Sequence, residues 1–270
     1  MGTVVRRLIE FPCAGETLMG SLDKADGKTG LLIVSGGNEL RMGAHRGMAL
    51  LAQAVANAGY PVFRFDARGI GDSTGENHGF EARGPDIAAA AATFRAAAPH
   101  MTRLVAFGNC DAASALLLHP VEPAFDALLL ANPWVVEQDG DDPLPPASAI
   151  RARYAAKLKD PREWLRLLRG GVNIKKLVSG LRKASSKQNE VVGGLAGRVV
   201  EAIGQQPERI RLLLAEQDNT AIAFTDTWKR APEPLHTAVP LHRCPTASHS
   251  FAREADKNWL TEQVLAALTS

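Results

Sequence analysis

The chain alternates short apolar runs with helical patterns, and this alternation limits the folds open to it more than any other feature. Apolar runs that are typical of buried parallel strands occupy residues 30–35, 60–65, 103–107, 125–131, 209–215 and 239–243. Helical patterns follow at residues 45–58, 85–98, 112–118, 221–230 and 257–268. Strands that alternate with helices predict a parallel sheet with right-handed crossovers and helices on both faces.

A hairpin precedes this series. Residues 4–11 and 16–22 are short strand-like segments separated by Pro12-Cys13-Ala14-Gly15, which predicts an antiparallel pair. Together with the six later runs, the hairpin gives an eight-stranded, mostly parallel sheet.

One interval, residues 132–208, is too long for a single loop and contains helical patterns. We therefore predict a core formed by residues 1–135 and 206–270, with a helical cap inserted at residues 136–205. Between Pro146 and Gln205, 13 Lys/Arg against 4 Asp/Glu give a net charge of +9 in a chain whose total is +2. This basic segment is either a solvated helical face or a lid that meets an anionic substrate, an acidic partner or a membrane surface.

The composition excludes several classes of protein. With 46% hydrophobic and 22% charged residues the chain is not disordered. It has no apolar run long enough to span a membrane and no signal-peptide pattern, so we expect a cytoplasmic protein without stable membrane insertion. We expect no nucleic acid partner, and the spacing of the three cysteines suggests neither disulfides nor a metal site. No cofactor is expected.

The most informative turn joins an apolar strand to a helix rich in small residues. It reads Gly108-Asn-Cys110-Asp-Ala112, which matches a G-x-S-x-G nucleophile elbow with cysteine in place of serine. The strained corner needs small neighbours two residues away on each side, and Gly108 and Ala112 meet that need. A helix N-terminus beside the sulfur favours a thiolate. Cys110 is therefore the candidate nucleophile, and the alternative is a packed cysteine that acts as a small hydrophobic residue.

Two further residues complete a candidate triad in the usual chain order of nucleophile, acid and histidine. Asp218 follows the strand that ends near residue 215, and His249 lies in the loop after the last strand. His249 would take the thiol proton of Cys110, and Asp218 would fix the tautomer and orientation of His249.

The loop after the strand at residues 30–35 is the expected source of oxyanion-hole donors. One N–H group would come from Gly37 or Asn38, and the second from Asp111, which follows the nucleophile.

Three other side chains are candidates for substrate contact. Arg41 and His45 lie in the same loop and would either brace the following helix or contact the substrate. Trp134 lies where the cap is expected to begin.

A second glycine-rich turn, residues 65–75, lacks the pattern of a phosphate-binding loop. It predicts a structural turn that braces the elbow.

These features together resemble the α/β-hydrolases, over nearly the whole chain apart from the cap. The segments at residues 36–46, 108–115 and 132–135 are similar to those of the subgroup called exosortase A system-associated hydrolase 1. The resemblance implies a Cys-His-Asp hydrolase encoded near bacterial exopolysaccharide and protein-sorting genes. It implies no substrate.

The expected function is cleavage of an ester, thioester or lactone through an acyl-cysteine intermediate. Two alternatives stay open, an acyltransferase that uses an acceptor other than water and a non-catalytic binding protein on a hydrolase scaffold. The expected partner is a small-molecule acyl substrate, and the basic segment suits an anionic thioester such as one of coenzyme A. The sequence leaves the oligomeric state open, a dimer included.

Overall fold

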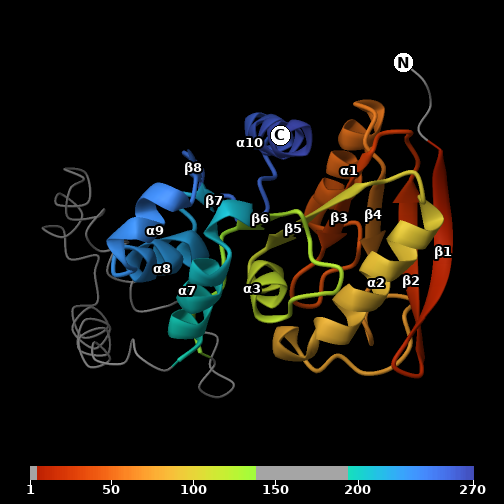
Figure 1. Cartoon of the computed structure of the whole chain (residues 1–270), viewed down its shortest axis with the longest axis horizontal. Helices are drawn as coiled ribbons and strands as arrows, with labels where there is room; N and C mark the ends of the chain where they lie inside the picture. Colours follow the sequence, from red (N-terminus) through yellow and green to blue (C-terminus); the bar gives the residue numbers. More distant parts are fainter. Residues whose placement is uncertain (1–4, 138–193) are drawn as a thin grey trace, which may run out of the picture.

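The computed structural model describes residues 5–137 and 194–270, and it contains an eight-stranded sheet. The strands are β1 (Arg6–Cys13), β2 (Glu16–Asp23), β3 (Thr29–Val34), β4 (Val62–Phe65), β5 (Arg103–Asn109), β6 (Ala127–Ala131), β7 (Ile210–Ala215) and β8 (Leu241–Cys244). Their order across the sheet is β1-β2-β4-β3-β5-β6-β7-β8 (Figure 1). The eight-stranded sheet predicted from the sequence is confirmed.

The strands from β4 to β8 in this order are parallel. The hairpin of β1 and β2 is antiparallel, and β2 pairs with β4 antiparallel as well. Because parallel strands share one direction, the loops that follow β3, β5, β7 and β8 all emerge at the same edge of the sheet. In open α/β sheets this carboxyl edge is where ligands bind.

Helices cover both faces of the sheet (Figure 1). The longer ones are α1 (Gly47–Asn57), α2 (Gly84–Ala97), α3 (Asp111–Leu118), α7 (Leu195–Gln205), α8 (Asn219–Trp228), α9 (Glu233–Ala238) and α10 (Glu254–Thr269). Short 3₁₀ helices are η1 (Ala44–Arg46), η2 (Phe80–Ala82) and η3 (Pro207–Arg209).

Alternate strand residues pack into two separate apolar clusters, one on each face. Leu31 and Ile33 of β3 lie with Val55 of α1 and Val264 of α10, whereas Leu32 lies in the cluster that α2, α3, α7 and α8 cover. The period of two along each strand therefore places one apolar layer under each set of helices.

The helical cap expected at residues 136–205 falls mostly on residues 138–193, which lie outside the described residues. Its last part is described. Helix α7 packs against α3 and buries Leu195, Val199 and Ile203 in the main core. The Glu137 carboxylate accepts a hydrogen bond from the Leu195 N–H at 3.0 Å, so the two described ends of the inserted segment meet at the start of α7.

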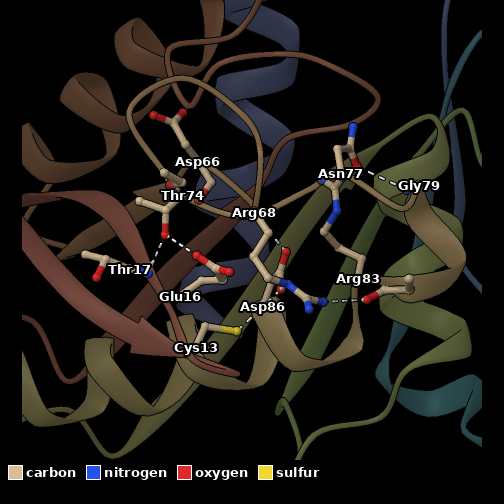
Figure 2. A network of polar contacts seen from close by, with 12 residues as sticks. Cys13, Glu16, Thr17, Asp66, Arg68, Thr74, Asn77, Gly79, Arg83 and Asp86 are labelled. Atoms are coloured by element: carbon tan, nitrogen blue, oxygen red, sulfur yellow. Dashed lines mark hydrogen bonds and ion pairs between the residues drawn. The ribbon is translucent and has the colours of Figure 1, made fainter.

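The glycine-rich turn at residues 65–75 is held by side chains of neighbouring elements. Figure 2 shows Arg68 bonded to Asp86 of α2, and Asp86 also accepts from the Cys13 thiol at 3.4 Å. The Thr74 hydroxyl accepts a hydrogen bond from the Thr17 N–H at 2.9 Å and so ties the turn to β2. These contacts make it a structural turn.

No helix among the described residues combines the length and the apolar character needed to cross a bilayer.

Candidate active site

The turn between β5 and α3 has the strained geometry of a nucleophile elbow. Cys110 adopts φ 62° and ψ −128°, a conformation that residues with side chains rarely take. The Cys110 N–H donates to the Ala131 carbonyl at 2.9 Å, and the Cys110 carbonyl accepts from the Trp134 N–H at 3.2 Å. A Cβ added to Gly108 would lie 2.8 Å from the carbonyl of Ala112, so this position requires glycine.

The structure brings the three predicted triad residues together at the carboxyl edge of the sheet. His249 Nδ1 donates to Asp218 Oδ2 at 2.9 Å, and His249 lines the same pocket as Cys110. Asp218 caps α8, because its carboxylate accepts the N–H groups of Thr220 at 3.0 Å and Ala221 at 3.2 Å. The cap fixes the carboxylate that faces His249.

The electrostatics of the pair favour a charged imidazole. Burial alone would lower the pKa of His249, but the hydrogen bonds to Asp218 and Cys110 outweigh burial and raise this pKa to about 10. Burial alone would raise the pKa of Asp218, yet the hydrogen bond from His249 and the charge of His249 bring it below its ordinary value. Each group therefore stabilises the ionised form of the other.

This pair predicts a pH-dependent contribution to folding. The pKa of His249 rises from 6.5 to about 10 on folding, so its stabilising effect is fully present below pH 6.5 and is lost as the pH rises through 10. We expect the difference in melting temperature between wild type and His249→Ala to be largest near pH 6 and to shrink steadily towards pH 10. Thermal unfolding of both proteins in matched buffers measures it, and a difference that is constant over this range would contradict the ion pair.

Two side-chain amides hold the backbone of His249 in place. The Asn109 side chain donates to the His249 carbonyl at 3.1 Å, and the Asn132 side chain donates to Asn109 Oδ1 at 2.9 Å. Asn132 is fully buried, has φ 43°, and accepts the Ala215 N–H at 2.8 Å. It thus links the ends of β5, β6 and β7 to the loop that carries the histidine.

A pocket of about 430 Å³ opens above Cys110 and His249. The residues that line it come from the loops at the carboxyl edge and are Gly36, Gly37, Asn38, Glu39, Phe80, Asn109, Cys110, Asp111, Trp134 and His249. Cys110 and His249 are both partly exposed, whereas Asp218 is buried behind the imidazole. A small molecule in this pocket would therefore reach the sulfur and the imidazole directly.

The Gly37 N–H, a candidate oxyanion donor by its place in the sequence, already has an acceptor in this structure. It donates to both oxygens of the Asp111 carboxylate, at 2.9 and 2.8 Å. Asn38 lines the pocket and accepts a hydrogen bond from Asn77 at 2.7 Å through its side-chain oxygen.

Of the three tentative substrate contacts, the structure places one in the pocket. Trp134 lines it, and its carbonyl accepts the Ser114 hydroxyl at 2.6 Å. Arg41 is not among the lining residues, because its guanidinium pairs with buried Asp66 and donates to Ser21 at 3.0 Å. His45 is exposed in η1 and also lies outside the lining. In this structure both residues belong to the loop before α1 rather than to the pocket.

Four residues that shape the site were not predicted from the sequence: Glu39, Phe80, Asn109 and Asn132. Asn109 directly precedes the nucleophile and Asn132 begins the Asn-Pro-Trp-Val segment. Their positions in the sequence could therefore have indicated that they lie near the site. Phe80 has no such indication, because it reaches the pocket from η2 only through the tertiary fold.

Among residues 5–137 and 194–270, no group of three or more His, Cys, Asp or Glu side chains is placed to hold a metal ion.

Sheet order, helices on both faces and a nucleophile elbow after β5 define the α/β-hydrolase fold, and solved structures of that fold resemble the chain. An esterase of Pyrococcus furiosus is similar at a TM-score of 0.60 and 16% identity, covering 98% of this chain and 91% of its own. The α/β hydrolase GrgF of Penicillium sp. sh18 aligns at a TM-score of 0.63 and 16% identity, with 98% of both chains covered.

A lidless α/β serine hydrolase of Xanthomonas campestris aligns at a TM-score of 0.57 and 16% identity, covering 100% of this chain and 95% of its own. At these identities the likeness shows the fold alone. No protein-family model matches the chain, and no curated protein sequence is similar to it.

Proposed function

We propose that this protein is a hydrolase that cleaves an ester, thioester or lactone through an acyl-cysteine intermediate on Cys110. The observation that carries the proposal is the placement of three side chains. The sulfur lies on a strained turn, its histidine partner lies in the same pocket, and Asp218 bonds that histidine at 2.9 Å from behind. The esterase and hydrolase names of the structural neighbours agree with this class of reaction.

The reaction would proceed in two steps. In the first, the Cys110 sulfur forms a bond to the substrate carbonyl carbon, and the bond from that carbon to the leaving oxygen or sulfur breaks. His249 accepts the thiol proton and gives it to the leaving group. In the second, a water molecule loses a proton to His249 and attacks the thioester carbon. The C–S bond breaks, the acid leaves, and the proton returns to the sulfur.

Asp218 would keep Nδ1 of His249 protonated, so that Nε2 faces the sulfur and the substrate. The N–H group of Asp111 and one from Gly37 or Asn38 would stabilise the oxyanion. Phe80 and Trp134 would supply apolar contacts for the acyl group.

Intact-protein mass spectrometry tests the intermediate. Wild-type protein is mixed with a series of short-chain thioesters and quenched in acid, and the acyl group is then located by peptide mapping. We expect a mass increase equal to one acyl group on Cys110, and no such increase in Cys110→Ala. Decay of the adduct in water alone indicates hydrolysis, whereas decay only with an added amine or thiol indicates acyl transfer. If no thioester or ester of the series acylates Cys110, the proposed reaction is wrong and a binding role remains.

A further inference from the structure

The Asp111 side chain occupies the place where the proposed reaction needs an oxyanion. Its two oxygens accept the Gly37 N–H at 2.9 and 2.8 Å. Gly37 is one of the two candidates, with Asn38, for the loop N–H group that would stabilise the oxyanion together with the N–H group of Asp111. The carboxylate thus takes a hydrogen-bond donor of the oxyanion hole, which the substrate carbonyl oxygen must enter.

The loop that faces this carboxylate is shaped to receive it. A Cβ added to Gly36 would lie 2.2 Å from Asp111 Oδ1, so only glycine leaves room for the carboxylate. Behind the loop, buried Arg83 donates to the carbonyls of Ser35 at 3.2 Å and Gly37 at 3.3 Å. Figure 2 shows Arg83 beside Asn77, to which it also donates. The loop is therefore held from behind while its Gly37 N–H faces the Asp111 side chain.

The charges around the pocket favour release of the carboxylate by a hydrogen-bond donor or a cation. Among the described residues that line it, Glu39 and Asp111 are acidic, His249 is the cationic group, and none is Lys or Arg. Burial raises the pKa of Asp111, although the Gly37 hydrogen bond and the charge of Arg83 oppose this effect. Burial also raises the pKa of Glu39. The charge of Asp111 raises this pKa further, whereas the charge of His249 lowers it. An oxyanion formed next to an ionised Asp111 would be repelled by it.

We propose that Asp111 determines substrate specificity by blocking the oxyanion hole until the acyl group brings a hydrogen-bond donor or a positive charge on its α-carbon. This inference rests on the proposed function. A donor on the α-carbon is attached to the carbonyl that enters the hole, so it can bond the carboxylate that the carbonyl oxygen displaces. α-Amino and α-hydroxy acyl esters or thioesters are therefore the favoured substrate class. Plain acyl groups lack the donor, and groups with a carboxylate are repelled.

A matched set of benzyl thioesters tests the inference: propanoyl, lactoyl, alanyl and succinyl. The assays are run near pH 6.5, where an α-amino group is largely protonated. Wild type should turn over the alanyl thioester at least about 10-fold faster, in kcat/KM, than the propanoyl thioester, with lactoyl between them and succinyl slowest. Asp111→Ala should bring the alanyl-to-propanoyl ratio close to one, chiefly by raising the propanoyl rate. The rise should approach the roughly 100-fold value of one oxyanion donor. Asp111→Asn keeps an oxygen that can accept the Gly37 N–H but loses the charge, so it should lower the ratio by a smaller amount.

Asp72→Asn is the matched control, because Asp72 is exposed and lies outside the pocket lining, and it should leave the ratio unchanged. Circular dichroism and melting temperatures confirm that the Asp111 variants are folded. Equal wild-type rates for alanyl and propanoyl, a preference for succinyl, or an unchanged ratio in both Asp111 variants would each overturn the inference. An equal loss of kcat/KM on all four thioesters in the Asp111 variants would also overturn the inference. In those cases acyl-Cys110 still forms, whereas failure of the proposed function itself leaves Cys110 unacylated in wild type and variants alike.

Discussion

Replacement of Cys110 by alanine should lower kcat/KM for ester and thioester cleavage by roughly 10⁴- to 10⁶-fold. The reason is that alanine removes the atom that would form the covalent bond and leaves the pocket and the Asp218–His249 pair intact. Cys110→Ser should also be much slower than wild type, because a hydroxyl is far less acidic than a thiol and gains less from a nearby imidazolium. Steady-state kinetics on p-nitrophenyl esters and on thioesters measure both effects.

The other two cysteines provide the control. Burial, reinforced by the Asp86 charge, raises the pKa of the Cys13 thiol to about 11. Burial and Asp256 raise that of Cys244 as well. Iodoacetamide should therefore modify Cys110 first, with loss of activity in proportion, and Cys13→Ala and Cys244→Ala should keep most of the activity. Activity that survives in Cys110→Ala would show that another group attacks the substrate.

Asp218→Asn should lower kcat by about 10³- to 10⁴-fold while the protein stays folded. Asparagine is also a good N-cap, so the bonds from Thr220 and Ala221 to this side chain can be kept. The amide has no negative charge to hold Nδ1 of His249 protonated or to stabilise an imidazolium. Rates of turnover, together with the melting temperature, separate this effect from unfolding.

The same variant has a second expected result that a purely structural role would not give. Two causes that raise the pKa of His249 are the hydrogen bond to Asp218 and the charge of Asp218, and both weaken or vanish in Asp218→Asn. The pH at which His249 loses its charge should therefore move downwards, and the pH profile of kcat/KM should move with it. Asp226→Asn removes a charge from a half-exposed position of the same helix and should change neither rate nor profile. An unchanged pH profile of kcat/KM in Asp218→Asn would mean that Asp218 only caps the helix.

Most of the fold could be predicted from the sequence, because the patterns that indicate strands and helices lie within short segments. The apolar runs and their spacing predicted the eight strands, and the elements differ from the prediction by a few residues at their ends. Helix α9 was missed, because Glu233–Ala238 is short and carries no buried residue that would produce an apolar period. Position 108 could also be interpreted locally, since a sharp corner requires glycine there.

The candidate site was predictable only where chain order carries information. Cys110, Asp218 and His249 each follow a strand, and parallel strands end at one edge, so their meeting follows from topology. The contacts between loops do not. Arg41 stands four residues after Gly37, which lines the pocket, yet its guanidinium pairs with Asp66 from a different loop.

The sequence by itself determined the class of fold, the strained turn and the chain order of the triad, because periodicity, glycine positions and strand ends are properties of short segments. The tertiary structure alone decided that Asn109 and Asn132 anchor the His249 loop and that the Asp111 carboxylate takes the Gly37 N–H. These contacts join residues from 23 to 140 positions apart, and their hydrogen bonds exist only once the sheet has brought its loops to one edge.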